Sequence, residues 1–320
     1  MAKNAIILLN LGGPDSLDAV QPFLFNLFCD PDIFKIPFGQ KFLAGLISKR
    51  RSPRIVEQYK QIGGKSPINE WTEIQRKKLT QTLSDRGADA DVYTAMRYWK
   101  PLTAETAEII RQKNYQNVIL LPRYPHFSVS TTGSSFNEWD RVYKGDQTRV
   151  KKIPTYFNHP GYVAALNAKI DEGLLKFPEH IRQSVLLLFS AHGTPVSMVK
   201  KGDPYSKEIK ETIDAVMALR NKSHDYALSF QSKVGPVEWL RPATDEKIEE
   251  LSKAGKKHLL VIPVSFVSDH IETLFELDIE YRHVAHEAGI ENFIVMPGLN
   301  DSQVFINALA DIVTESSYLL

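Results

Sequence analysis

The segment VSDHIETLFELDIEY carries a histidine and several carboxylates directly after the apolar run HLLVIPVSF. These residues are Asp269, His270, Glu272, Glu276, Asp278 and Glu280. A histidine beside carboxylates can move protons or bind a divalent metal. The group is not HExxH and has no cysteine, so its oxygen-rich donors suit a transient metal better than a closed structural zinc site.

Glu272, Glu276 and Glu280 stand four residues apart, a spacing at which like charges repel in an isolated helix. The alternative interpretation is a solvated helix face, but Leu274 and Phe275 and their apolar neighbours leave no clean polar face. On an α-helix each step of four overshoots a full turn by about 40°. A locally wider helix would hold the carboxylates nearer to one line, as a path for cations or protons requires.

His192 ends the apolar run VLLLFSAH and is followed by Gly193, which lets the backbone bend and a ligand come close. Ligands of open α/β sheets bind outside the carboxyl ends of the strands, so His192 and the acidic segment should share a cleft. The alternative is a strand-end histidine that is merely hydrogen-bonded.

The elements that would position these residues are short apolar runs alternating with amphipathic segments. The runs predict strands at 5–11, 91–98, 117–124, 149–157, 185–192, 226–232, 258–266 and 292–298. The amphipathic segments predict helices at 72–85, 103–114, 161–177, 205–222, 244–255 and 301–316. Apolar runs without polar alternation are typical of strands covered on both faces. The chain is therefore expected to have an α/β fold with parallel sheets.

Two pairs of segments resemble each other, IILLNLGGP with VLLLFSAHGTP and NVILLPRYPHFS with KHLLVIPVSFVS. They suggest an internal duplication into two similar halves, 1–160 and 161–320, with the ligand cleft between them. The alternative is that parallel strands commonly end in Gly/Pro turns whatever their origin.

Length and composition exclude several classes of protein. The net charge of +1 argues against a nucleic-acid partner. Cys29 is the only cysteine, so neither an internal disulfide nor an iron–sulfur cluster can form within one chain. No apolar run approaches the roughly 18 residues of a membrane span, and the start lacks the features of a signal peptide. A cytoplasmic location is expected.

Residues 22–51 break the alternation with many phenylalanines, interrupting prolines and the basic cluster Lys49–Arg50–Arg51. Their length suggests a functional flap: an apolar lip around a flat ligand, or a patch that touches a membrane. The alternative is an amphipathic helix packed on the core.

Aromatic residues beside cations and hydroxyls suit a planar anionic ligand. Arg97 and Tyr98 end a predicted strand, and Trp239 adds another ring. The loops LGGP, QIGGKSPI and YPHFSVSTTGSS offer backbone N–H and hydroxyl donors to carboxylates or phosphates. They lack the fingerprints GxGxxG and GxxxxGK[ST], so a nucleotide site is not indicated.

The segments FSAHGTP, QSKVGPVEWL, SFVSDHIETLFELDIEY, YPHFSVSTTGSS, KRRSPRIVEQY and IGGKSPI closely resemble, in their order, the signature segments of the ferrochelatase family. The resemblance covers nearly the whole chain. It implies insertion of Fe(II) into protoporphyrin IX, the last step of protohaem synthesis, with the porphyrin held between two Rossmann-like lobes. Iron is then a substrate, and no permanently bound cofactor is expected.

Matched by motif, the resemblance implies roles for individual residues. His192 is the metal ligand, the acceptor of the pyrrole protons, or both, and Glu272 faces it as a second metal ligand. His270 and Asp269 support that pair, and Glu276 and Glu280 form the acidic path.

The porphyrin-binding residues by motif are Leu11 at the pocket wall, Arg51 and Ser66 near the propionates, and Arg97 and Tyr98 on the opposite wall. The segment 22–51 is the lip at the pocket mouth, with peripheral contact to the inner face of the membrane. Thr194 stands where relatives commonly have leucine, and His126 where glutamine is common.

A monomer is expected, with a dimer as the alternative. Competing functions are a chelatase for coproporphyrin III or another tetrapyrrole, and a non-catalytic porphyrin or haem carrier.

Overall fold

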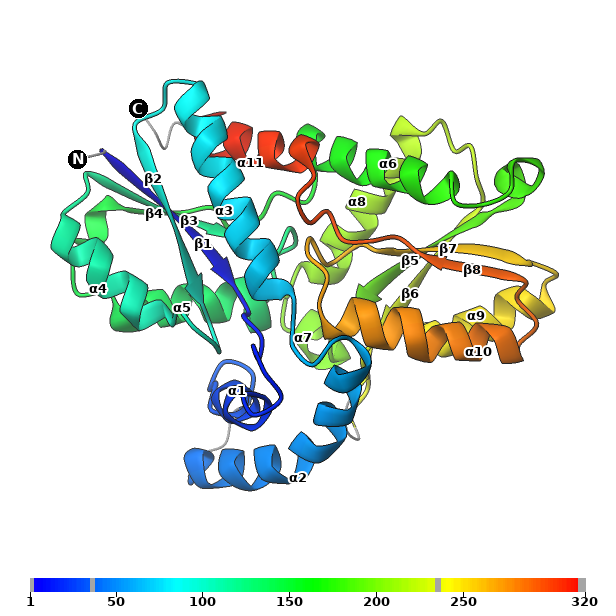
Figure 1. Ribbon diagram of the computed structural model, residues 1–320, viewed down its shortest axis with the longest axis horizontal. Coiled ribbons are helices and arrows are strands. Elements are labelled where there is room, and N and C mark those ends of the chain that lie inside the picture. Colours follow the sequence, from blue (N-terminus) through cyan, green and yellow to red (C-terminus); the bar gives the residue numbers. More distant parts are fainter. Residues whose placement is uncertain (1–2, 35–37, 234–236, 316–320) are drawn as a thin grey trace. The chain divides into compact units, whose positions relative to one another are not determined.

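The computed structural model describes residues 3–34, 38–233 and 237–315, and the chain separates into two compact units (Figure 1). Unit 1 comprises residues 1–156 and 301–320, and unit 2 comprises residues 157–300. Each unit is built around one parallel sheet.

The sheet of unit 1 has the strand order β2-β1-β3-β4. Its strands are β1 (Asn4–Asn10), β2 (Ala90–Met96), β3 (Asn117–Pro122) and β4 (Val150–Lys152). All pairs are parallel, and the central strand β1 is buried along its whole length. Burial on both faces explains why this strand reads as an unbroken apolar run.

Helices cover both faces of this sheet. The helices of the unit are α1 (Val20–Phe28), α2 (Gln40–Gln61), α3 (Ile68–Asp85), α4 (Thr103–Lys113), the π-helix η1 (Val129–Gly133), α5 (Ser134–Val142), the short 3₁₀ helix η2 (Gln147–Arg149) and α11 (Gln303–Glu315). Of these, α1 and α2 pack mainly on each other. One core cluster joins Ile7 and Leu9 of β1 to Ile110 of α4 and the fully buried Trp139 of α5. Helix α3 packs on β1 and β2.

Helix α11 belongs to unit 1, although the sequence analysis assigned residues 301–316 to the second lobe. It packs against α3 through a buried apolar face that includes Phe305 and Leu309. Arg86 Nη1 lies 2.6 Å from Asp311 Oδ1 across the same contact. The chain therefore returns to the first unit after completing the second, because the apolar stripe of α11 is buried there.

The sheet of unit 2 repeats the arrangement with the strand order β6-β5-β7-β8. Its parallel strands are β5 (Leu186–His192), β6 (Tyr226–Gln231), β7 (His258–Pro263) and β8 (Asn292–Val295). Adding four to each strand number of the first sheet gives the order of the second. The matching order supports the duplication hypothesis.

One helix of unit 2 carries the acidic segment and follows β7 in the chain. The helices of the unit are α6 (Pro160–Leu174), the 3₁₀ helix η3 (Glu179–Ser184), α7 (Val196–Lys200), α8 (Tyr205–Leu219), α9 (Thr244–Lys253), the π-helix η4 (Glu272–Glu280) and α10 (Tyr281–Glu287). Leu277 of η4 and Tyr281 of α10 share one buried core cluster with Val261 of β7, which anchors the acidic helix to the sheet.

The eight predicted strands and the predicted α/β class are confirmed, and each of the six predicted helical segments contains an α-helix. Segment 22–51 contains the end of α1 and the start of α2, and its residues 35–37 lie outside the described part. Phe23 and Phe28 are buried, as core packing requires, whereas Phe38 and Phe42 are 89% and 76% exposed. Core packing therefore accounts for only one face of the lip. Over the described ranges, no helix combines the length and apolarity needed to cross a bilayer.

Candidate active site

His192 is held at the carboxyl end of β5 by its own backbone. Its N–H donates to Ser265 Oγ at 2.8 Å, and the N–H of Gly193 donates to the Gln231 carbonyl at 2.8 Å. A Cβ at position 193 would lie 2.6 Å from that carbonyl oxygen, so only glycine allows the approach. The turn thus points the imidazole beyond the edge of the sheet.

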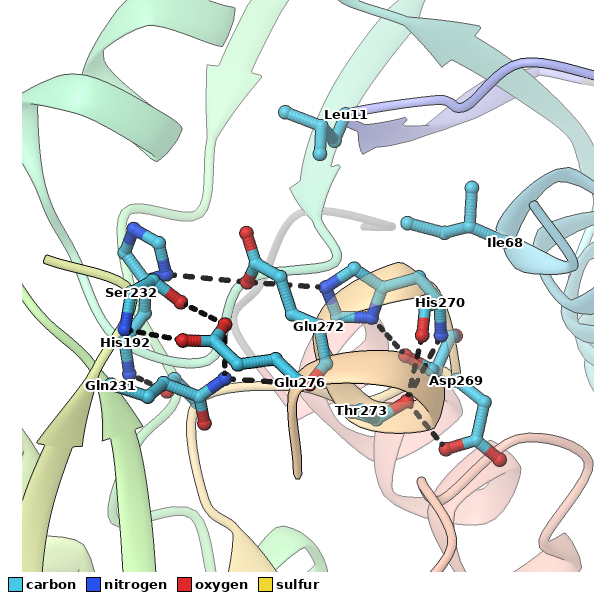
Figure 2. A network of polar contacts seen from close by, with 12 residues as sticks. Leu11, Ile68, His192, Gln231, Ser232, Asp269, His270, Glu272, Thr273 and Glu276 are labelled. Atoms are coloured by element: carbon cyan, nitrogen blue, oxygen red, sulfur yellow. Dashed lines mark hydrogen bonds and ion pairs between the residues drawn. The ribbon is translucent and has the colours of Figure 1, made fainter. Parts of the chain in front are cut away.

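Glu272, the first residue of the π-helix η4, faces two imidazoles (Figure 2). Its Oε2 lies 3.2 Å from His192 Nδ1 and 3.3 Å from His270 Nε2. The side chains of His192 and Glu272 are 37% and 26% exposed, so both are within reach of a ligand. His270 is buried, with Nδ1 3.0 Å from the Ser268 carbonyl oxygen, which fixes the orientation of its ring.

The charges of this pair support each other. Burial lowers the pKa of His192, but the negative charge of Glu272 more than offsets this, and the pKa ends above its ordinary value. Burial likewise raises the pKa of Glu272, but the positive charge that His192 and His270 carry when protonated holds it well below the usual range. Glu272 is therefore ionised near neutral pH and stabilises a proton on His192.

Asp269 fixes the turn that carries His270 and Glu272. Its carboxylate accepts hydrogen bonds from Gly298 N at 2.9 Å, Asn300 Nδ2 at 2.7 Å and Thr273 Oγ1 at 3.0 Å. Both oxygens are thus used inside a buried network, which suits a supporting role. The expected catalytic role of Asp269 stays a prediction.

Glu276 stands four residues after Glu272 on η4, and hydrogen-bond donors surround its carboxylate. Its carboxylate accepts from Ser232 N at 2.7 Å, Ser232 Oγ at 2.5 Å and Gln231 Nε2 at 3.2 Å (Figure 2). It also accepts from Tyr281 Oη at 3.1 Å. Burial and the charge of Glu272 raise its pKa, against the opposing hydrogen bond from Ser232. A carboxylate of raised pKa can take up and release a proton nearer neutral pH.

The π-helical form of η4 matches the wider helix considered from the sequence. Its i→i+5 hydrogen bonding turns each residue through less than the 100° of an α-helix. The file of carboxylates runs from half-buried Glu272 through Glu276 to Glu280, which is exposed. A path along the three glutamates stays a prediction.

Several residues that shape this site escaped the sequence analysis. They are Ser265, which orients His192, Gln231 and Ser232, which hold Glu276, and Thr273, which bonds to Asp269. The signal that could have found Gln231 and Ser232 is their position at the carboxyl end of β6, the strand next to β5.

Trp239 lies beside the His192 turn within unit 2. It pairs with Pro195 in an isolated bridge, and its Cε3 would lie 3.4 Å from a Cβ at position 193. The neighbouring Thr194 is buried, and its carbonyl accepts from Leu240 N at 3.1 Å. Trp239 is thus close to the histidine, as a ring that packs on a bound ligand should be.

The remaining predicted porphyrin contacts belong to unit 1. Leu11 follows β1, and the buried Ser66 donates its N–H to the Pro14 carbonyl at 2.8 Å. The exposed Arg51 places its guanidinium 5.7 Å from the centre of the Phe28 ring. Arg97 and Tyr98 are brought together, but their polar groups are directed at the buried Asp30. Direct contact of all five with a porphyrin stays a prediction.

Chemically, the His192–Glu272 pair can accept a proton and can offer one nitrogen and one oxygen to a divalent cation. Within the part of the chain that the structure describes, no group of three or more His, Cys, Asp or Glu side chains is arranged to hold a metal ion. One nitrogen and one oxygen donor suit a cation that binds briefly and then exchanges its ligands.

Two parallel sheets of one strand order, with a histidine–carboxylate pair at a strand end in the second, define an α/β protein with a doubled fold. The chain resembles the solved structure of CbiX, the terminal enzyme for siroheme biosynthesis in denitrifying bacteria, with a TM-score of 0.57 and 12% identity over 98% of this chain and 99% of that one. It resembles SirB from Bacillus subtilis with Fe3+ with a TM-score of 0.55 and 11% identity over 98% and 96% of the two chains. These likenesses concern the fold alone.

The sequence comparisons are more specific. The family profile described as Ferrochelatase matches residues 3–317. Proteins named Ferrochelatase from Rippkaea orientalis and from Synechocystis are 48% and 47% identical, each over 99% of this chain and 83% of the relative. The chain belongs to the ferrochelatase family and is a chelatase enzyme.

Proposed function

We propose that this enzyme inserts Fe(II) into protoporphyrin IX, which yields protohaem and two protons, as the last step of haem biosynthesis. The observation that carries the proposal is the pairing of His192 with Glu272 at 3.2 Å in a chain of the ferrochelatase family. Iron and porphyrin are both substrates. Cys29 is the only cysteine, so one chain has no thiolate set for an iron–sulfur cluster.

The reaction needs a proton acceptor. A free porphyrin carries two inner N–H protons, and its nitrogen lone pairs point into the ring plane, so metal enters only when the ring bends and both protons leave. Neutral His192 accepts a proton, and ionised Glu272 stabilises the imidazolium that results. Contacts to the rest of the macrocycle supply the binding energy that keeps the ring bent.

The protons then need a way out. Glu276 stands next in the file with a raised pKa, and the exposed Glu280 ends it. A proton taken up near His192 can pass along these carboxylates to solvent. Fe(II) is held weakly by His192 and Glu272, because it must exchange these ligands for the four ring nitrogens.

Six residues are proposed to contact the porphyrin. These are Leu11, Arg51, Ser66, Arg97, Tyr98 and Trp239. They combine apolar walls, an aromatic ring and cations suited to propionates.

The test is an anaerobic incubation of the protein with Fe(II), or with Zn(II) as a stable substitute, and either protoporphyrin IX or coproporphyrin III. The visible spectrum follows metal insertion. Faster insertion into protoporphyrin IX supports the proposal, and faster insertion into coproporphyrin III overturns the substrate assignment. Porphyrin binding without insertion would identify a carrier instead. The variant His192→Ala should bind porphyrin but insert no metal.

We also propose that the lip makes peripheral contact with the inner face of the membrane, for a cytoplasmic, monomeric enzyme. Exposed Phe38, Phe42 and Leu46 stand four residues apart, and Lys41, Lys49 and Arg50 are exposed beside them. An apolar row flanked by cations is typical of helices that lie on anionic bilayers.

Flotation with phosphatidylcholine vesicles, with and without phosphatidylglycerol, tests this contact. Phe42→Ser should reduce vesicle binding, whereas Ile109→Ser, at an exposed apolar residue of α4, should leave it unchanged. Equal binding of both variants would remove the lip from membrane contact. Sedimentation velocity of the wild-type protein tests the monomer.

A further inference from the structure

The base of the lip is tied to unit 1 by a buried carboxylate, Asp30, which lies just after α1. Its Oδ1 lies 3.0 Å from Arg97 Nη2 and accepts from Asp32 N at 2.8 Å. Its Oδ2 accepts from the Tyr98 hydroxyl and, at 2.5 Å, from Ser134 Oγ. One side chain therefore joins three parts of the unit: the turn after α1, the residues after β2 and the first residue of α5.

The partners of Asp30 are also joined to each other. Arg97 Nε donates to Ser134 Oγ at 2.9 Å, so that hydroxyl donates to Asp30 and accepts from Arg97. Asn26 Nδ2 of α1 donates to the Tyr98 carbonyl at 3.0 Å. The side chain of Arg97 is only 9% exposed. The network of Asp30, Arg97, Tyr98 and Ser134 is called the clasp below. Arg97 Nη1 also lies 3.7 Å from Glu138 Oε2 of α5, outside the clasp.

The clasp extends to the start of α2. The N–H of Phe34 donates to the Asp30 carbonyl at 2.9 Å, and the Phe34 carbonyl accepts from Gln40 Nε2 at 3.0 Å. The rings of Phe28 and Phe34 are 5.1 Å apart. Both helices of the lip therefore connect to the buried carboxylate through a short chain of contacts.

The charges in the clasp make it rigid. A buried carboxylate without a cation and donors is strongly disfavoured, so Asp30 holds Arg97, Tyr98 and Ser134 in one arrangement. Burial and the charge of Asp30 raise the pKa of Tyr98 well above its ordinary value, which keeps the hydroxyl protonated as a donor.

We propose that Asp30 is a positioning residue that fixes the lip as a rigid wall for the porphyrin and holds Arg97 and Tyr98 in place beside it. This inference rests on the proposed function, since it assumes that a porphyrin packs against the lip. It differs from the flap expected from the sequence, because a flap would move freely at its base.

Asp32 provides a matched control in the same turn. Its carboxylate accepts from Asn137 Nδ2 at 3.0 Å and lies 3.5 Å from Arg141 Nη2, with a partly exposed side chain. Asp32→Asn removes the same charge as Asp30→Asn, two residues away, but leaves the clasp intact.

The first measurement needs no porphyrin. Four residues of α2 that trypsin recognises are exposed: Lys41, Lys49, Arg50 and Arg51. Trypsin can cleave after them once the helix unfolds locally. Asp30→Asn should speed cleavage at these sites by at least about tenfold, and Asp32→Asn by less than about twofold. Equal cleavage rates in the two variants would overturn the inference, whatever the enzyme's substrate.

The second measurement addresses the porphyrin. Release of protoporphyrin IX, followed by fluorescence in stopped flow, should be about tenfold faster from Asp30→Asn than from Asp32→Asn. The KM for porphyrin should rise more than kcat falls. Faster cleavage with unchanged porphyrin release would refute the role of the lip as a wall for the porphyrin. Failure of the proposed function would be seen separately, as absent iron insertion in the wild-type protein. If Asp30→Asn does not fold, Ser134→Ala, which keeps the ion pair, should change both rates in the same direction by a smaller factor.

Discussion

Replacing Glu272 with glutamine would remove the negative charge 3.2 Å from His192 Nδ1 while preserving the shape of the side chain. Two unit charges at that distance interact by about 1.3 kcal/mol in water and by about 5 kcal/mol at an effective dielectric constant of 20. Because the two side chains are 37% and 26% exposed, solvent screens part of the interaction, and about 2 to 3 kcal/mol is a reasonable value.

This energy is lost only when His192 carries a proton. If His192 accepts a pyrrole proton in the rate-limiting step, Glu272→Gln should lower kcat by about 30- to 150-fold, since each 1.36 kcal/mol is tenfold in rate. The pH dependence should change as well. Burial lowers the pKa of His192 and Glu272 raises it, so without Glu272 the pKa falls. Because neutral His192 is the acceptor, the low-pH limb of the rate should move to lower pH.

The assay is anaerobic insertion of Fe(II) or Zn(II) into protoporphyrin IX across a range of pH, at saturating porphyrin. Asp278→Asn is the matched control, because Asp278 is on the same π-helix but pairs with Arg282 at the surface. A limb that stays in place in Glu272→Gln, or moves to higher pH, would refute the assignment of His192 as the proton acceptor. So would an equal loss of rate in both variants.

Three further substitutions test the site and the core. Glu276→Gln should slow turnover by about tenfold or more while changing the porphyrin dissociation constant, measured by fluorescence quenching, by less than about twofold. An unchanged rate would remove Glu276 from the path. Gly193→Ala forces a Cβ to within 2.6 Å of the Gln231 carbonyl, so it should cost about 1 to 3 kcal/mol in urea unfolding and lose activity. Wild-type stability and activity in Gly193→Ala would show that the backbone of this turn shifts at little cost. Trp139→Ala should cost about 3 to 5 kcal/mol in the same assay, and a smaller cost would mean that the core of unit 1 repacks.

The strands were predictable because their physical signal is local. Runs such as that of β5 are apolar over most of their length, since helices cover both faces of each sheet. The same runs place His192 and the acidic segment at strand ends, where parallel strands present their ligand-binding side chains. The contact of His192 with Glu272 follows from the adjacency of β5 and β7.

What the sequence could not supply depends on distant pairing. Asp30 in CDPD has the appearance of an ordinary turn residue, and only tertiary structure brings Arg97 and Ser134 onto it. The placement of α11 on α3 has no local signal either, because an apolar stripe does not say which sheet it covers. The π-helical form of η4 depends on backbone bonding that side-chain periodicity leaves open.

The π-helix also limits how this chain can change in length. A π-helix, with i→i+5 hydrogen bonds, has more residues in each turn than an α-helix. Removing one residue between 272 and 280 would therefore favour an ordinary α-helix there. Every side chain beyond the deletion would then rotate by about 100° relative to Glu272. The sheet and its apolar contacts would tolerate that rotation poorly, and the glutamates after the deletion would face elsewhere. Insertions and deletions should therefore be accommodated in the loops of unit 2 and avoided in this segment.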